Sequence, residues 1–499
     1  MQPTSPDTPN AHTKASVAKR VPRQDLVVVG AGAAGLSAAS IASRIGARIT
    51  LIETNRMGGD CLYTGCIPSK ALLRAAACAQ NARESRRFGI HLSEPVIDFA
   101  GVHEHIRRAI AAIEPEDSAE RYRILGARVI PGSATLIDRH TIRVGRETIP
   151  TRSIVLATGA RPIVPTLPGL AGARFVTSET VWELKDCPKH LLVLGGGPVG
   201  CELGQAFARL GSRVTLIESG SRILPQEPKT AAELLELALR KEGVNLLTET
   251  RALRIEGSDP HAKLVVSHTD GSQASIDFDI LLIAVGREPR THGFESLNLL
   301  RKAGGLLATN DYLETSQPGI YAAGDVTSAL QFTHVAGQQG AYAALNALFR
   351  PLIRLRWNQS PIPRVTYTSP EIASVSRTGT RLSAVAKTIT IPLREVNRAV
   401  TDGAENGCAL IGINKKGCLE SATLIMPHAG EIISELALAI QERLPLGRIL
   451  ALIHPYPTYS EINRRAASVW REERMSGLGR QLIRVMLALL RRLGKGHSG

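Results

Sequence analysis

The sequence predicts an α/β protein in which two similar units built on parallel strands precede a separate α+β domain. Two glycine-rich loops, each behind an apolar run, support the first part of this prediction; they are Gly30–Gly35 and Gly195–Gly200. An acidic residue, Glu53 or Glu218, ends a second apolar run at the same distance beyond each loop. From Val365 to about Trp470, β-like segments and one apolar-periodic run predict the third unit.

Each loop has the pattern G-x-G-x-x-G, which joins a strand to a helix in Rossmann-like dinucleotide-binding folds. Glycines at these positions let backbone N–H groups approach a pyrophosphate at the positive end of the helix. The acid at the end of the second strand accepts hydrogen bonds from a ribose hydroxyl. Because the whole unit occurs twice, two dinucleotide sites are expected at Gly30, Gly32, Gly35 and Glu53, and at Gly195, Gly197, Gly200 and Glu218.

Three further apolar runs continue into glycine, as strands of such units do. They cover residues 154–159, 280–286 and 320–324. Asp325, directly after the third run, could bind a polyol hydroxyl. The stretch 351–364, rich in proline and arginine, is expected to be a linker, and Ala429–Gln441 has the spacing of an amphipathic helix.

Cys61 and Cys66 follow the first loop in the stretch 58–70, which reads GGDCLYTGCIPSK. Two thiols in this place predict a disulfide that exchanges electrons with the bound cofactor. The chain has seven cysteines, an odd number that does not form the framework of a small secreted protein. One redox pair with scattered buried thiols indicates a reducing, cytoplasmic location.

The composition is that of a globular protein with about two to four domains. Its 499 residues are 43% hydrophobic and 21% charged, with a net charge of +15. That charge suits an anionic partner, a membrane surface or simply basic tails; no nucleic-acid motif accompanies it, so no nucleic-acid partner is expected. Residues 1–24 are polar and predict a disordered basic tail. Neither a membrane span nor a resident metal is expected.

At these residues and several later motifs, the chain resembles the class I pyridine nucleotide–disulfide oxidoreductases, which include dihydrolipoamide dehydrogenase, glutathione reductase and mercuric reductase. The later motifs occur in the order GGGPVGCELG, ATGARP, AVGREP, YAAGDV, YTSPEIASV, GEIISELALAI and PTYSE. The resemblance implies an FAD domain over 25–165 and 288–356, an NAD(P) domain over 166–287, and an α+β dimerisation domain over 357–472. It also implies a homodimer in which the partner completes each active site.

The resemblance assigns individual roles. Cys66 is expected nearer the flavin, and Cys61 is expected to exchange with the substrate. Lys70 is expected near flavin N5, paired with Glu202, where its charge stabilises the reduced flavin. Further FAD contacts are expected from Gly30, Gly32, Gly35, Glu53, Ala134, Thr158, Gly159, Asp325, Gln331, Phe332, Thr333 and His334. Contacts to NAD(P) are expected from Gly195, Gly197, Gly200, Glu202, Glu218 and Gly286.

Glu218 favours NAD(H) over NADP(H), because its carboxylate would repel a 2′-phosphate. Arg222, four positions on, weakens this preference because it could attract the same phosphate.

The C-terminal signature departs from that of the thiol reductases and dihydrolipoamide dehydrogenases, which carry His-Pro-Thr-x-x-Glu with the histidine as acid and base for the substrate thiol. Residues 454–461 read HPYPTYSE, so the position of that histidine holds Tyr456, and Glu461 keeps the position of the glutamate. A tyrosine with a pKa of about 10 is a poor base at neutral pH, although it can donate a proton. His454 is the alternative acid and base, and a purely structural role for it stays open.

Mercuric reductases also have tyrosine in this region, but they hold the metal with an adjacent cysteine pair near the C-terminus. Here the last cysteine is Cys418, and Cys408 and Cys418 are expected in the core or at the surface of a sheet. A dihydrolipoamide-dehydrogenase-like enzyme is therefore the first hypothesis, narrowly ahead of a mercuric-reductase-like one. A reductase of quinones or other diffusible acceptors and a component of a multienzyme complex are the alternatives. The substrate is expected to be a small thiol, a disulfide or a metal-type acceptor.

Residues 473–499 extend beyond the resemblance, and 479–493 predict a basic amphipathic helix. One arc of the helical wheel holds Arg480, Arg484, Ala488, Arg491 and Arg492. The remaining arc, roughly 200° wide, holds Leu482, Ile483, Val485, Met486, Leu489, Leu490 and Leu493. Such a helix can pack on its own dimer, lie at the inner face of a membrane or dock on a partner protein.

Overall fold

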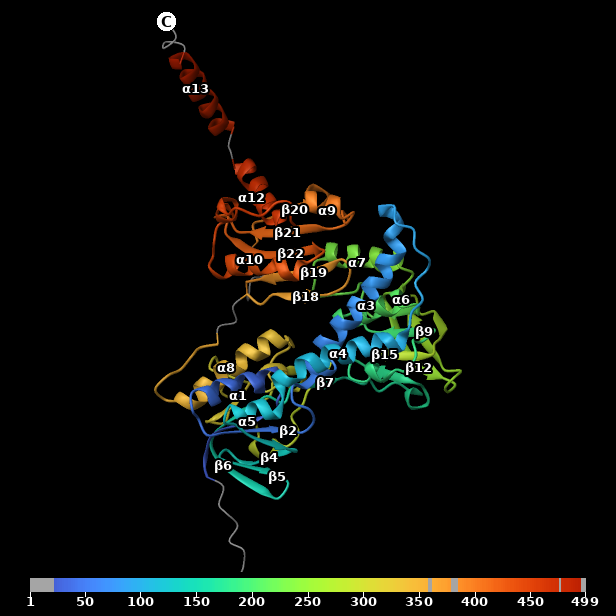
Figure 1. The fold of residues 1–499 in the computed structure, drawn as a ribbon, viewed down its shortest axis with the longest axis vertical. Coiled ribbons are helices and arrows are strands. Elements are labelled where there is room, and N and C mark those ends of the chain that lie inside the picture. The colour runs from blue at the N-terminus through green and yellow to red at the C-terminus, as the bar shows by residue number, and fades with distance from the viewer. Residues whose placement is uncertain (1–21, 358–360, 378–384, 475–476, 495–499) are drawn as a thin grey trace, which may run out of the picture.

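The computed structural model of the chain describes residues 22–357, 361–377, 385–474 and 477–494 (Figure 1). Most of the N-terminal tail predicted over residues 1–24, and the end of the extension, lie outside these residues. The described part is a mixed α/β protein with two largely parallel sheets and a separate antiparallel sheet, so the predicted fold class is confirmed.

The first unit has a seven-stranded sheet in the order β3-β2-β1-β6-β5-β4, with β17 beside β6. Its strands are β1 (Gln24–Val29), β2 (Ile49–Glu53), β3 (Arg128–Pro131), β4 (Ala134–Asp138), β5 (Thr141–Val144), β6 (Glu147–Leu156) and β17 (Ile320–Ala322). Strands β1, β2, β3, β6 and β17 are parallel, and the Val, Ile and Leu side chains of β1, β2, β6 and β17 are buried. Helices α1 (Ala33–Arg44) and α8 (Thr333–Phe349) pack against each other; a Cβ on Gly340 would lie 2.0 Å from the carbonyl oxygen of Ala34.

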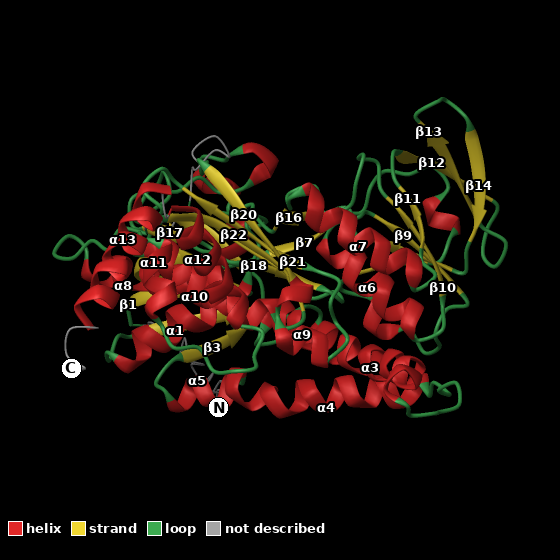
Figure 2. Ribbon diagram, turned by 90° about the horizontal axis from the view of Figure 1, so that it is seen from above, coloured by secondary structure: helices red, strands yellow, loops and turns green. Residues whose placement is uncertain are grey.

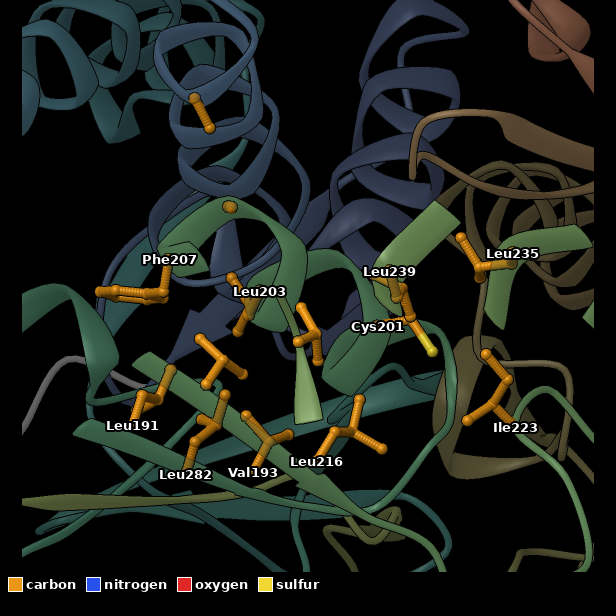
Figure 3. Packing of buried hydrophobic residues seen from close by; sticks show 14 of the residues in the cluster. Leu191, Val193, Cys201, Leu203, Phe207, Leu216, Ile223, Leu235, Leu239 and Leu282 are labelled. Carbon is orange, nitrogen blue, oxygen red and sulfur yellow. The ribbon is translucent and has the colours of Figure 1, made fainter. Parts of the chain in front are cut away.

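The second unit has a parallel five-stranded sheet in the order β11-β10-β9-β15-β8. Its strands are β8 (Phe175–Thr177), β9 (His190–Leu194), β10 (Arg213–Ile217), β11 (Asn245–Leu247) and β15 (Ile280–Ile283). Helix α6 (Pro198–Arg209) lies over this sheet, and α7 (Lys229–Lys241) follows β10. Figure 3 shows Leu203 and Phe207 of α6 packed over Leu191, Val193 and Leu282 of the strands. A small antiparallel sheet is attached: β12 (Thr250–Glu256), β13 (Lys263–His268) and β14 (Gln273–Asp277).

Two long helices, α3 (Cys66–Glu84) and α4 (Phe99–Asp117), connect the units. The short helix α2 (Gly59–Tyr63) leads into α3, which packs against α4 and against α6 of the second unit. Buried Leu72, Phe99 and Phe207 belong to one continuous core. The antiparallel pair β7 (Ala160–Pro162) and β16 (Arg287–Pro289) lies where the chain passes between the two units. The N-terminal end of α3, and with it Cys66, is thereby held at the junction of the two units.

The third unit is built on the antiparallel sheet β18-β19-β22-β21-β20 (Figure 2). Its strands are β18 (Arg364–Thr366), β19 (Glu371–Ser376), β20 (Lys387–Pro392), β21 (Cys408–Ile413) and β22 (Leu419–Met426). The predicted helix is confirmed as α10 (Ala429–Gln441), and its apolar face lies on the buried core of the sheet. The other helices are α9 (Asn397–Thr401), α11 (Leu446–Ala451), α12 (Glu461–Arg474) and α13 (Gly477–Gly494). In the described ranges no helix combines the length and the apolar character needed to cross a membrane.

Candidate active site

In both glycine loops, backbone N–H groups donate matching hydrogen bonds to the acidic residue at the end of the second strand. In the first unit, Glu53 accepts from the N–H of Ala31 at 2.6 Å and from the N–H of Asn55 at 2.8 Å. In the second unit, Glu218 accepts from the N–H of Gly196 at 2.8 Å and from the N–H of Gly220 at 2.6 Å. Each carboxylate is thereby held beside its glycine loop at the end of the second strand.

The first and third glycines of each loop are required by close packing. Gly30 and Gly195 have φ of +100° and +112°, and a Cβ on them would lie 2.3 and 2.5 Å from the carbonyl oxygens of Ala157 and Ala284. A Cβ on Gly35 would lie 1.8 Å from the carbonyl oxygen of Gly30. The corresponding distance for Gly200 and the Gly195 carbonyl oxygen is 2.0 Å.

The middle glycines, Gly32 and Gly197, cap α1 and α6, and a Cβ on either would meet no heavy atom within 4 Å. Open space therefore remains in front of each helix N-terminus, where a pyrophosphate binds in folds of this kind. The loops fit a dinucleotide in both units.

A cavity of about 1110 Å³ extends from the first loop to the junction of the two units. It is larger than the roughly 300–1,000 Å³ of an ordinary ligand pocket, which suits a dinucleotide. Among the residues predicted to contact cofactors, those lining it are Gly30, Gly32, Glu53, Lys70, Ala134, Thr158, Gly159, Glu202, Asp325, Gln331, Phe332 and Thr333. Both Cys61 and Cys66 line the same cavity. Burial raises the pKa of Asp325 to about 6.

Other predicted contacts lie outside this lining. Gly35 is inside the turn of the first loop, while His334 stacks on Phe332 and has Nε2 3.0 Å from the carbonyl oxygen of Pro363. Apart from Glu202, which lines the cavity, the residues of the second site are placed around the second loop, and Gly286, with φ of +130°, begins the return to the first unit.

The two cysteines are free thiols, with Cys61 inside α2 and Cys66 five positions further on. Cys66 is the first residue of α3, a position that favours a thiolate. The hydrogen bond with the Cys61 thiol, together with the Thr333 hydroxyl 3.2 Å from its Sγ and the Lys70 charge, lowers the pKa of Cys66 to about 6. The same hydrogen bond and burial raise the pKa of Cys61. The pair thus consists of a thiolate at Cys66 and a protonated thiol at Cys61.

Glu202 and Tyr367 hold the side chain of Lys70 beside this pair. Its Nζ lies 3.0 Å from Glu202 Oε2 on α6 and 4.2 Å from the ring centre of Tyr367. The other oxygen of Glu202 accepts from the backbone N–H of Tyr367 at 2.9 Å. The predicted pairing of Lys70 with Glu202 is confirmed. A buried carboxylate fixes this ammonium, whose side chain is 38% exposed, close to the thiols.

A second charged cluster on the cavity wall is missing from the sequence-based set of site residues. Asp60, directly before Cys61, forms an ion pair with Arg287, and Arg290 Nη2 lies 2.6 Å from Glu179 Oε1. The only signal in the sequence is the AVGREP motif, which contains Arg287 and is followed directly by Arg290. These pairs join the turn that carries Cys61 to the passage between the two units.

The three C-terminal candidates do not meet the cysteines within one chain. Tyr456 is 68% exposed, and its Oη accepts from Asn397 Nδ2 at 2.7 Å. His454 is turned inward, with its side chain 4% exposed and Nε2 3.2 Å from Glu435 Oε1 on α10. Glu461 begins α12, and its Oε2 is buried without a hydrogen-bond partner among the described residues. The geometry gives His454 a structural partner and leaves Tyr456 at the surface.

A thiolate–thiol pair in a cavity that also holds a dinucleotide loop, with a second such loop close by, defines a redox enzyme that uses two dinucleotides. The family of pyridine nucleotide–disulphide oxidoreductases matches residues 24–340, and the dimerisation domain of that family matches residues 362–467. The chain belongs to this family and is an FAD-dependent oxidoreductase that uses a pyridine nucleotide, as predicted.

Several relatives are similar over most of their length. A mercuric reductase of Streptomyces lividans is 35% identical over 89% of this chain and 96% of its own length. A dihydrolipoyl dehydrogenase of Thermus scotoductus is 34% identical over 91% of this chain and 99% of its own. Among solved structures, the Cu(II) complex of the HOCl-induced flavoprotein disulfide reductase RclA from Escherichia coli is 26% identical, with a TM-score of 0.77 over 88% of this chain and 98% of its own. LpdA from Mycobacterium tuberculosis is 28% identical, with a TM-score of 0.80 over 89% of this chain and 99% of its own.

Proposed function

We propose that the protein is an NADH-dependent reductase that delivers electrons through Cys61 and Cys66 to an acceptor. The acceptor is one that reacts with thiolates, either a disulfide or a soft metal ion. The observation that carries this proposal is a thiolate at Cys66 beside the protonated thiol of Cys61, while Tyr456 holds the position of the family's basic histidine. FAD bound along the first loop, together with the nicotinamide, would supply the two-electron transfer to this pair.

The preference for NADH is supported by the second loop. Both oxygens of Glu218 are held by backbone N–H groups at the end of β10, where the carboxylate would face a ribose and repel a 2′-phosphate. Arg222 is turned away, because its guanidinium donates to the carbonyl oxygens of Glu227 at 2.7 Å and of Pro225 at 2.8 Å. The nearby cation therefore does not offset the carboxylate.

The two thiols have separate roles in the proposed reaction. Once the pair is reduced, the Cys61 sulfur attacks one sulfur of a disulfide substrate and forms a mixed disulfide, and the Cys61 proton passes to the departing sulfur, which leaves as the first product thiol. Cys66, already a thiolate, then attacks the Cys61 sulfur and restores the Cys61–Cys66 disulfide, and the second product leaves as a thiolate that takes a proton from water. With a soft metal ion as substrate, the two thiolates would be its ligands.

Reduction of a soft metal ion is favoured over oxidation of a dithiol because only the dithiol needs a base. A dithiol substrate must lose its protons, and a positioned histidine usually accepts them. Here Tyr456 stands at that position and His454 is bound to Glu435. A soft metal ion brings no thiol proton to remove and releases no thiolate that must be protonated, whereas reduction of a disulfide needs the proton transfers of dithiol oxidation in reverse. The mercuric reductases among the relatives, and RclA, whose structure is titled a Cu(II) complex, support this direction.

Oxidation of dihydrolipoamide with NAD⁺ is the second candidate, supported by the dihydrolipoyl dehydrogenases among the relatives. The deciding experiment compares two rates of the FAD-loaded protein. One is NADH consumption with Hg(II), Cu(II) or a small disulfide, and the other is NADH formation from dihydrolipoamide. A faster first rate supports the proposal, and a faster second rate contradicts it.

The matched control tests the route of the electrons. Cys61→Ser with Cys66→Ser should abolish reduction of these acceptors, whereas Cys187→Ser, which changes a half-buried thiol bonded to Ser212 in the second unit, should leave it unchanged. Turnover that survives loss of the redox pair would instead favour a reductase of quinones or other diffusible acceptors.

A further inference from the structure

Helix α13 takes no part in the proposed reaction. It follows α12, and the match to the family's dimerisation domain ends at residue 467, before α13 begins. In Figure 1 it projects beyond α12, away from the three sheets. All residues from 481 to 491 are exposed.

Most of the exposed surface of α13 is apolar. Leu482, Met486 and Leu489 are 65%, 59% and 53% exposed, although they lie on the same face of the helix. The other exposed apolar side chains of α13 are Ile483, Val485, Leu487 and Leu490. A continuous apolar face of this kind marks an interaction surface in a water-exposed protein.

The polar face of α13 carries only positive charge. Arg484 and Arg491 are exposed there, and the sequence from 477 to 494 contains two further arginines and no acidic residue. The whole chain has a net charge of +15. The occupant of this surface must therefore be anionic and must accept a broad apolar face at the same time.

A second copy of the chain meets only one of these requirements, because a second α13 would cover part of the apolar arc but would supply no anionic group for the arginines. A groove on an acidic protein would cover an apolar stripe, whereas the apolar arc here is roughly 200° wide. An anionic bilayer meets both requirements, since lipid phosphates face the arginines while the acyl boundary takes the apolar side chains. The arginines also explain why this helix would lie along the surface rather than across the membrane.

We propose that α13 attaches the protein to the surface of an anionic phospholipid bilayer. The helix lies in the plane of the interface, with Leu482, Met486 and Leu489 in the acyl boundary. Arg484 and Arg491 lie at the level of the phosphates.

The test is flotation of the full-length, FAD-loaded protein with two kinds of vesicle, phosphatidylcholine alone and phosphatidylcholine mixed with phosphatidylglycerol. The protein should float with the mixed vesicles only, and high salt should weaken this binding. Arg484→Gln with Arg491→Gln should lower the partition coefficient about 30-fold, from about 1 kcal/mol for each basic residue at the surface. Leu482→Asn with Leu489→Asn should abolish flotation by removing apolar contacts.

The charge-matched control is Arg143→Gln with Arg146→Gln, which removes two exposed arginines on and beside β5, at the opposite end of the molecule in Figure 1. This control should bind like the unchanged protein, and all variants should keep the same rate of acceptor reduction. Equal binding to both kinds of vesicle, binding to neither, or the same loss in the control would overturn the proposal. So would a change from dimer to monomer in the α13 variants, which would show that a second copy covers the helix.

Discussion

Replacing Thr333 with valine should raise the pKa of Cys66, because the threonine hydroxyl lies 3.2 Å from the sulfur and stabilises the thiolate. The pKa of Cys66 is lowered to about 6 by the Cys61 thiol, by this hydroxyl and by Lys70. A hydrogen bond to a charged group contributes about 1.5–3 kcal/mol. At about 1.4 kcal/mol for each pKa unit, the midpoint should rise by about one to two units.

The assay is alkylation of the NADH-reduced protein by iodoacetamide over a range of pH, with the Cys66 peptide quantified by mass spectrometry. Only the thiolate reacts, so the rate falls as pH drops through the pKa. The unchanged protein should show a midpoint near the pKa of about 6, and Thr333→Val a midpoint nearer neutral or above. Thr333→Ser keeps the hydroxyl and should titrate like the unchanged protein. An unchanged midpoint in the valine variant, or an equal shift in the serine variant, would refute the role of the hydroxyl.

Two further predictions concern the glycine loops. Gly35→Ala should prevent folding of the first unit, since its Cβ would lie 1.8 Å from the Gly30 carbonyl oxygen, whereas Gly32→Ala should fold normally and lose FAD during gel filtration. Equal FAD retention in Gly32→Ala and the unchanged protein would contradict this account. Glu218→Gln should lower the ratio of kcat/KM for NADH to that for NADPH about tenfold or more, because a close like-charge repulsion disappears. A ratio that stays the same would show that other groups select the nucleotide.

The features that could be predicted from the sequence are those determined by short, local sequence patterns. The backbone geometry of the two glycine loops is fixed by steric contacts at Gly30 and Gly195. The repeated sequence therefore gives the same hydrogen bond in both units, from a loop N–H to the acidic residue. The spacing of apolar residues was enough to predict helix α10. The pairing of Lys70 with Glu202 joins distant segments, and only the resemblance to a family could supply it.

The features that were not predicted depend on where charged side chains meet in space. Arg287 reaches Asp60, which is 227 positions away, and no local pattern specifies such a partner. Arg222 is near Glu218 in sequence, but its guanidinium is used by two carbonyl groups of its own loop. His454 is close to the expected position of a catalytic histidine, yet its partner on α10 could be found only from the packed structure.

Replacing Tyr456 with histidine tests directly whether a missing base sets the direction of the reaction. Glu461, five positions on, has a buried carboxylate oxygen with no partner among the described residues, and the family signature uses a glutamate there to orient the histidine. A positioned base contributes about 10²–10⁴-fold, so Tyr456→His should raise dihydrolipoamide oxidation by about a hundredfold or more. Tyr456→Phe, which removes the hydroxyl without adding a base, should bring no gain. If the histidine variant oxidises dihydrolipoamide no faster than the phenylalanine variant, the absence of a base does not explain the preference for reduction. The site would then disfavour dithiols for another reason.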